Sequence, residues 1–300
     1  MIKLPTFVVI GASKSGTTSL YFYLRQHPDI YLPKRKELHF FSFPELGLTS
    51  FGPGDAAVLS GLCQTWEQYT GYYSDVPDRL AIGDISASYL YYSGSARKIF
   101  EKLGLVKLIV IIRNPVDKAY SQYMHLVREG LETLSFPEAI GAEAARRKQG
   151  WGDMWRYMES GLCGDRLEEF ITVFGKERVK IILFDDFVKN TSSVLTDLFQ
   201  YLHIDLKVEI STNEIFNRTG LPRSVFISNI LRNSSWLKEL IKPLIPINLR
   251  YKLRNWLTNI NTKDKPELPP ELYRDLLNNF RDDIAKVEGL IGKPTGWLQG

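Results

Sequence analysis

Cysteine is scarce in this sequence: Cys63 and Cys163 are the only two among 300 residues. They stand far apart, and neither belongs to a Cys-x-x-Cys pair. A disulfide framework needs several cysteines, and a structural zinc site needs clustered ligands. The sequence therefore predicts neither, and a reducing compartment is the expected environment.

Long hydrophobic runs are also missing. No stretch reaches the roughly 18 consecutive apolar residues that a membrane-spanning helix needs. The first apolar run, residues 7–10, is short and leads directly into a glycine, which is typical of a core strand and not of a signal peptide. We therefore expect a cytoplasmic protein without a transmembrane segment.

A strong excess of one charge is absent as well. Lysine and arginine number 38 against 34 acidic residues, which gives a net charge of +4. This surplus is too small to indicate a nucleic-acid-binding protein, and it suits an anionic small ligand. Hydrophobic residues make up 44% of the chain, enough for a sizeable core, and no internal repeat is evident. We treat residues 1–300 as a single domain.

Short apolar runs alternate with segments of helical periodicity. The predicted strands cover residues 7–10, 108–112 and 179–187, and the predicted helices cover 17–27, 117–128, 165–174 and 192–202. Strands that alternate with helices are typical of a parallel sheet that binds ligands at the carboxyl ends of its strands. The sequence thus predicts an α/β fold, a P-loop-like doubly wound parallel sheet flanked by helices.

Three other segments lack this alternation. Residues 42–80 and 131–160 are rich in Gly, Pro, Tyr and Trp, and we interpret them as long insertions over the site. Residues 231–261 carry six basic residues and one acid among many apolar positions. That segment is either a surface that docks a membrane or a partner, or a set of helices packed on the sheet with a solvated basic face.

The glycine loop after the first strand suggests a phosphate ligand. Gly11 and Gly16 have the spacing of a Walker A loop, but Thr17 stands where that motif has its lysine. The lysine is instead Lys14, inside the loop, where it reaches the phosphate nearest the loop. A purely structural turn would also explain the glycines. The cation, the hydroxyls and the free N–H groups together favour a ligand with a single 5′-phosphate that bears a transferred group.

A second polar pair follows the strand at 108–112. Arg113 comes directly after this strand, and Ser121 lies about two turns into the next helix. Both are expected at the carboxyl edge of the sheet, where a guanidinium suits a second phosphate. The alternative is that Arg113 forms a salt bridge with a residue of the helix that follows it.

These motifs resemble those of sulfotransferases that use 3′-phosphoadenosine 5′-phosphosulfate (PAPS), particularly bacterial enzymes akin to heparan sulfate sulfotransferases. The resemblance rests on "KSGTTSL" and "RNPVDKAYSQYMH", and it continues through "KRKELHFF", "GDISASYLYY", "FNRTGLPRS" and the C-terminal "FRDDIAKVEGLIGKPTGWL". It implies a 5′-phosphosulfate loop made of Lys14, Ser15, Gly16, Thr17 and Thr18. It also implies that Arg113 and Ser121 bind the 3′-phosphate.

The resemblance assigns further residues to cofactor and acceptor. A C-terminal loop that closes over the nucleotide would consist of Arg218, Thr219, Gly220 and Arg223. Glu37 corresponds to the general base that takes the proton of the acceptor hydroxyl, and His39 assists it. The alternative, from composition alone, is that Glu37 is an exposed ion-pair partner of the basic residues before it. The acceptor side would include Asp84, Ser86 and Tyr89.

The implied reaction is in-line transfer of a sulfuryl group from PAPS to a hydroxyl, leaving adenosine 3′,5′-bisphosphate (PAP), with no metal. The acceptor class stays open among a carbohydrate, a lipid or polyketide-like alcohol, and a group delivered by a carrier protein. Two alternatives for the chain as a whole remain. One is a metal-dependent P-loop kinase or NTPase, which would need Mg²⁺. The other is a non-catalytic nucleotide-binding module, which would have no use for Glu37.

Overall fold

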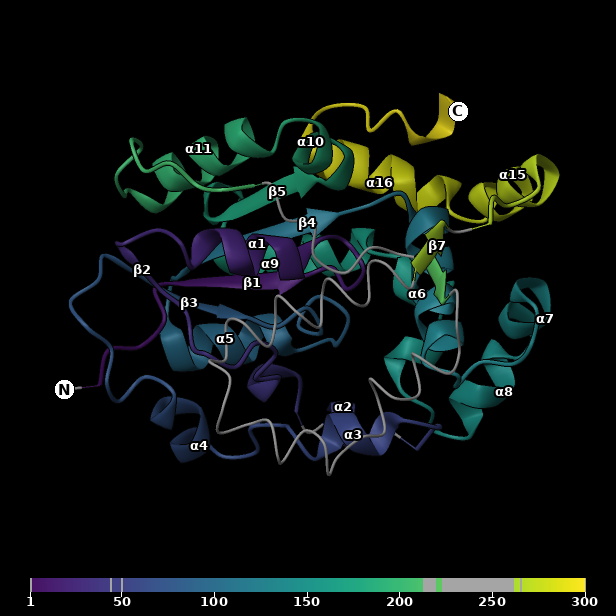
Figure 1. Ribbon diagram of the computed structural model, residues 1–300, viewed down its shortest axis with the longest axis horizontal. Coiled ribbons are helices and arrows are strands. Elements are labelled where there is room, and N and C mark those ends of the chain that lie inside the picture. The colour runs from purple at the N-terminus through teal and green to yellow at the C-terminus, as the bar shows by residue number, and fades with distance from the viewer. Residues whose placement is uncertain are drawn as a thin grey trace.

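The computed structural model of the chain describes residues 2–43, 45–49, 51–212, 220–222, 262–264 and 266–299. Its centre is a five-stranded parallel sheet with helices on both faces (Figure 1). The strands are β1 (Phe7–Gly11), β2 (Ile30–Tyr31), β3 (Ala81–Ile85), β4 (Lys107–Ile112) and β5 (Val179–Leu183), in the spatial order β2-β3-β1-β4-β5. The predicted P-loop-like α/β fold is therefore confirmed.

The helices fall into those that flank the sheet and those that lie in the insertions. The flanking helices are α1 (Thr17–Leu24), α5 (Ser95–Leu103), α6 (Pro115–Arg128), α9 (Gly164–Phe174), α10 (Phe184–Lys189), α11 (Thr191–Leu202), α15 (Pro270–Asn278) and α16 (Arg281–Ile291). The insertion helices are α2 (Glu45–Leu48), α3 (Asp55–Leu59), α4 (Trp66–Gly71), α7 (Phe136–Gly141) and α8 (Glu143–Lys148). A separate antiparallel pair is formed by β6 (Gly220–Pro222) and β7 (Thr262–Asp264).

The central strands are apolar along their length because both faces of the sheet are covered. In β1, Val8 and Ile10 belong to the core that lies against α5, α6, α9 and α16, whereas Phe7 and Val9 belong to the core formed with α1 and α11. Side chains of successive strand residues point to opposite faces, so one strand supplies both cores. Among the described residues, no helix combines the length and the apolar character needed to cross a bilayer.

The order of the strands places a topological switch point between β1 and β4. From β1 the chain runs to the edge strand β2 and back to β3, and from β3 it passes over β1 to reach β4. The connections that leave β1 and β4 therefore run in opposite directions. Such a point in an open α/β sheet is where ligands bind, at the carboxyl ends of the strands.

The predicted strand at 179–187 is wrong in its second half. β5 ends at Leu183, and the helix α10 begins at Phe184. Phe187 is buried, and the ring of Phe184 packs on the Arg113 guanidinium at 4.5 Å. These tertiary contacts turn the apolar run into a helix, and the acids Asp185 and Asp186 stabilise its first turn.

Gly83 in β3 provides a test of how tightly the sheet is packed. A methyl group at this position would overlap the ring of Phe7 and lie 2.7 Å from Cδ2 of Leu32. We expect Gly83→Ala to lower the free energy of unfolding by about 3 kcal/mol, the upper end for overpacking a core. Gly71→Ala is the matched control, because a methyl group there has no atom within 4 Å. Urea unfolding measures both, and equal stability of the two variants would contradict the packing described.

Candidate active site

The loop after β1 has a backbone shaped for close approach to an anion. Lys14 and Gly16 both have positive φ angles, 62° and 87°. A methyl group at Gly16 would also lie 3.2 Å from the rings of Phe184 and Phe187. Both the positive φ angle and this close packing therefore require glycine at position 16. The helix α1 begins at Thr17, and its first N–H groups therefore face the loop.

Arg113 joins this loop to the end of β4. Its Nη1 donates a hydrogen bond to the Lys14 carbonyl at 3.1 Å. Its Nε is buried and has no hydrogen-bond partner in the described part of the chain. A buried donor without a partner is costly unless a ligand accepts from it. Burial also lowers the pKa of Arg113 from its usual value.

Lys14 lies among other cations. Burial, Arg128 and Arg113 lower the pKa of the Lys14 ammonium to about 7. Lys36 adds to this effect, and Glu129 opposes it. Like charges held this close are favourable only when an anion joins them. The residues present therefore fit a ligand with several negative charges, as the two phosphates of PAP provide.

His125 and Arg128 are site residues that the sequence analysis did not assign. Arg128 Nη2 lies 2.9 Å from His125 Nδ1, and Arg128 also forms a 3.6 Å ion pair with Glu129. The charge of Lys14, followed by burial, lowers the pKa of His125 well below its usual value, so the ring is neutral. The signal was available, because His125 and Arg128 follow Ser121 at positions four and seven on the same face of α6.

Glu37 and His39 lie in a tight turn beside the end of β3. Both residues have positive φ angles, 61° and 58°. Glu37 Oε2 accepts a hydrogen bond from the Ala87 N–H at 2.7 Å, and its Oε1 is paired with the Lys36 ammonium. His39 Nδ1 lies 2.7 Å from Ser88 Oγ, and its Nε2 is 3.9 Å from Glu37 Oε2.

The protonation states in this turn follow from its charges. Burial raises the pKa of Glu37, but the charge of Lys36, the charge that His39 carries when protonated, and the hydrogen bonds from Lys36 and the Ala87 N–H more than offset that, so the pKa lies below its usual value. Burial lowers the pKa of His39 against the opposing charge of Glu37. At neutral pH Glu37 is therefore a carboxylate beside a neutral imidazole.

Lys36 connects this turn to the glycine loop. Its Nζ contacts Thr17 Oγ1 at 3.3 Å and also contacts the Glu37 carboxylate. The predicted 5′-phosphosulfate loop and the predicted base thus meet at one ammonium. The sequence analysis treated Lys36 only as part of a basic run.

The remaining predicted residues are placed as follows. Ser121 is buried in α6, and Asp84, Ser86 and Tyr89 come together in a buried cluster at the end of β3. Gly220 begins β6, which lies beside α6 (Figure 1). Arg218, Thr219 and Arg223 fall outside the described residues, as does the basic segment 231–261.

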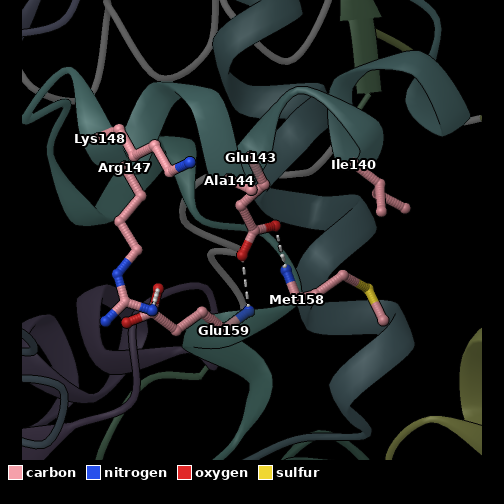
Figure 2. Close-up of a pocket in the computed structure, with 7 residues that line it drawn as sticks. All are labelled: Ile140, Glu143, Ala144, Arg147, Lys148, Met158 and Glu159. Carbon is pink, nitrogen blue, oxygen red and sulfur yellow. Dashed lines mark hydrogen bonds and ion pairs between the residues drawn. The ribbon is translucent and has the colours of Figure 1, made fainter.

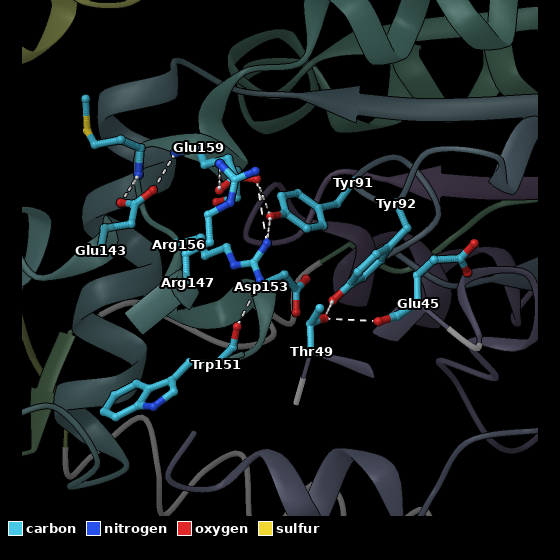
Figure 3. Close-up of polar contacts among 12 residues, drawn as sticks. Glu45, Thr49, Tyr91, Tyr92, Glu143, Arg147, Trp151, Asp153, Arg156 and Glu159 are labelled. Atoms are coloured by element: carbon cyan, nitrogen blue, oxygen red, sulfur yellow. Dashed lines mark hydrogen bonds and ion pairs between the residues drawn. The ribbon is translucent and has the colours of Figure 1, made fainter. Parts of the chain in front are cut away.

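The insertions build a polar wall that continues from the loop after β3. Figure 3 shows Tyr91, Arg156 and Glu159 pointing toward one another: the Tyr91 hydroxyl donates to Glu159 Oε1 at 2.8 Å and accepts from Arg156 Nη1 at 2.9 Å. Beyond this wall lies a cavity of about 680 Å³ (Figure 2), lined by Ile140, Glu143, Ala144, Arg147, Lys148, Met158 and Glu159. The segment 131–160, together with Tyr91, therefore forms this surface.

The parallel sheet, with its glycine loop between β1 and α1, defines the class of the protein as a P-loop-like α/β fold. The family model described as "Sulfotransferase family" matches residues 5–208. The chain belongs to this sulfotransferase family.

Known proteins similar to the chain include two solved structures and a curated relative. The crystal structure of a sulfotransferase from Alicyclobacillus acidocaldarius is 30% identical, with a TM-score of 0.79 and coverage of 100% of both chains. Mouse sulfotransferase SULT7A1, solved in complex with PAP, shares the fold at 16% identity and a TM-score of 0.50, over 93% of this chain and 84% of its own. Carbohydrate sulfotransferase 15 from Rattus norvegicus is 24% identical over 247 residues, which are 67% of this chain and 44% of the relative. The chain thus spans less than half of that relative.

Proposed function

We propose that the protein transfers a sulfuryl group from PAPS to an acceptor hydroxyl, with Glu37 as the general base. The observation that carries the proposal is the position of Lys36, which contacts both the Glu37 carboxylate and Thr17 of the glycine loop. A base next to an anion-binding loop suits transfer of a sulfuryl group from a donor held by the loop to an acceptor held by the base. Membership of the sulfotransferase family supports the reaction class.

Bound PAPS would supply an activated sulfuryl group, whose bond to the 5′-phosphate breaks as the acceptor oxygen bonds to sulfur. Glu37, a carboxylate at neutral pH, takes the proton of the attacking hydroxyl at a carboxylate oxygen. Lys14 and the N–H groups at the start of α1 stabilise the charge that develops on the 5′-phosphate. Arg113, whose Nε has no hydrogen-bond partner among the described residues, and Ser121 bind the 3′-phosphate.

We infer that the acceptor is a carbohydrate hydroxyl. Carbohydrate sulfotransferase 15 matches two thirds of this chain, and it supports this class over a lipid or a carrier-bound alcohol. The half-buried Tyr91 in this wall offers an aromatic ring of the kind that stacks on sugar rings. Screening the three acceptor classes with labelled PAPS tests the inference, and sulfation of a lipid alcohol alone would reject it.

The donor site is tested by calorimetric titration with PAP in the absence of metal. We expect wild-type protein to bind and Arg113→Ala to bind about 10- to 100-fold more weakly, since a hydrogen bond to a charged group contributes about 1.5–3 kcal/mol. Arg166→Ala, on the exposed side of α9, is the control and should bind like wild type. Binding of ATP with Mg²⁺ instead of PAP would favour a kinase. PAP binding without turnover on any acceptor would favour a binding module.

A further inference from the structure

Asp84 is a buried carboxylate held by hydroxyl groups. Its side chain lies at the end of β3, and the residue is 1% exposed. Oδ2 accepts hydrogen bonds from Tyr89 at 2.7 Å and Tyr69 at 3.1 Å, and Oδ1 accepts one from Ser86 at 3.0 Å. In the part of the chain that the structure describes, no ion pair neutralises it. A buried charge that depends on hydroxyl donors is costly, and such groups are often retained for a function.

The hydrogen bonds continue from this cluster into the turn that contains the base. Ser86 Oγ accepts a hydrogen bond from the His39 N–H at 3.2 Å. The next residue, Ala87, donates its N–H to Glu37 Oε2 at 2.7 Å, and the Ile85 carbonyl accepts the Glu37 N–H at 3.0 Å. Three successive residues after Asp84 therefore hold Glu37 and His39.

The turn needs such support because its backbone is strained. A positive φ angle is unfavourable for a residue with a side chain, and both Glu37 and His39 have one. Each such residue costs about 1–3 kcal/mol and persists only where the surroundings determine its conformation. Residues 85–88 supply the hydrogen bonds to the Glu37 N–H and carboxylate and to the His39 N–H and ring, while Ser42, Phe43 and Cys63 donate to the carbonyls of the turn.

We propose that Asp84 is a positioning residue: with Tyr69, Tyr89 and Ser86 it fixes the segment that holds the Glu37 carboxylate in place. This inference rests on the proposed function, in which Glu37 is the base. The sequence predicted that Asp84, Ser86 and Tyr89 would lie on the acceptor side. Ser86 and Tyr89 are fully buried and Asp84 nearly so, which leaves them little surface to touch an acceptor and favours an indirect role.

The charge of Asp84 gives this role a pH signature. Burial raises the pKa of Asp84 to about 6, and the hydrogen bonds from Tyr89, Ser86 and Tyr69 oppose that rise. Glu37 also faces Asp84 and raises its pKa further. Below about pH 6 the Asp84 carboxyl takes up a proton and can then accept fewer hydrogen bonds from the surrounding hydroxyl groups. Turnover should therefore fall as the pH drops through this value.

The test compares two buried tyrosines that make the same kind of bond. Tyr89 donates to Asp84 Oδ2, and Tyr157 donates to Glu132 Oε2, each at 2.7 Å and each with the tyrosine fully buried. Both Phe substitutions remove a hydroxyl donor from a buried carboxylate, and Glu132 keeps its ion pair with Arg146. Only Tyr89→Phe loosens the turn that contains Glu37.

Turnover is measured with PAPS and the carbohydrate acceptor identified in the acceptor screen, whose hydroxyl does not itself titrate in this pH range, and PAP affinity is measured by calorimetry. We expect Tyr89→Phe to lower kcat by up to about 10²-fold, with PAP affinity unchanged, and to move the acid limb of the pH profile upward. Tyr157→Phe should keep the wild-type kcat and profile. If both variants lose kcat equally, or neither does, the positioning role is rejected.

A second measurement decides the question without turnover. Carbon NMR of labelled glutamate carboxyls follows the titration of Glu37, identified by its loss in Glu37→Gln. Tyr89→Phe should raise the pKa of Glu37, since the Ala87 N–H bond that lowers it weakens. An unchanged titration in this variant overturns the inference, whereas failure of wild-type protein to bind PAP overturns only the proposed function. If Tyr89→Phe does not fold, Ser86→Ala takes its place.

Discussion

Replacement of Glu37 by glutamine is expected to lower kcat by about 10²–10⁴-fold, the usual contribution of a positioned general base. Glutamine has nearly the shape of glutamate and can still accept the Ala87 N–H that Glu37 accepts. It has no basic oxygen for the proton of an acceptor hydroxyl. Steady-state turnover of PAPS on a screened acceptor measures the effect.

The same variant should bind PAP with an affinity within a few-fold of wild type. Glu101→Gln removes an exposed acid on α5 and serves as the control for the loss of one negative charge. If Glu37→Gln retains kcat, the base lies elsewhere, and His125 beside Lys14 is the next candidate.

Replacement of Lys14 by alanine is expected to raise the barrier to transfer by about 3–4 kcal/mol, which is a loss of about 10²–10³-fold in kcat. Lys14 lies in the loop with Arg113 bonded to its carbonyl, so the backbone that carries this side chain is fixed before any ligand arrives. Lys3→Ala, which removes an exposed ion pair with Asp78, is the control. If Lys14→Ala weakens PAP binding but keeps the wild-type kcat, the lysine contributes to binding of the cofactor and does not stabilise the transition state further.

The lowered pKa of Lys14 adds a pH dependence to PAP binding. In the free protein this pKa is about 7, and a bound anion raises it, so binding above pH 7 takes up a proton. PAP affinity should therefore fall as the pH rises above about 7, by at most tenfold per pH unit. Calorimetry in two buffers of different ionisation enthalpy measures the proton uptake. If the dependence survives in Lys14→Ala, it belongs to another group, such as His125.

The sequence predicted the parts of the site that follow buried strands. β1 and β4 are continuous apolar runs, so the loop with Lys14 and the position of Arg113 could be inferred from the pattern alone. The strand β3 could not be inferred in this way, because it contains Gly83 and Asp84 and so lacks the continuous apolar run that is typical of a buried strand. Only the family resemblance drew attention to it. Its Asp84 is stabilised by the hydroxyls of Tyr89, five residues later, and of Tyr69, fifteen residues earlier, and no periodic pattern brings these three residues together.

The features that the sequence did not predict depend on contacts between distant segments. The run after Leu183 has the composition of a strand, but Phe184 packs on Arg113 and a helix forms instead. The link from Lys36 to Thr17 joins two loops that no local pattern connects. A single sequence specifies local preferences, whereas these contacts depend on how the elements pack.

The hydrogen bond from Arg113 to the Lys14 carbonyl has a thermodynamic consequence for the ligand. A long, flexible arginine loses rotamer entropy when it becomes fixed, and this loss opposes whichever event fixes it. Here the side chain is already fixed by the backbone of the neighbouring loop and by the ring of Phe184. The entropic cost therefore falls on folding and not on association, and more of the electrostatic attraction to the nucleotide is expressed as affinity.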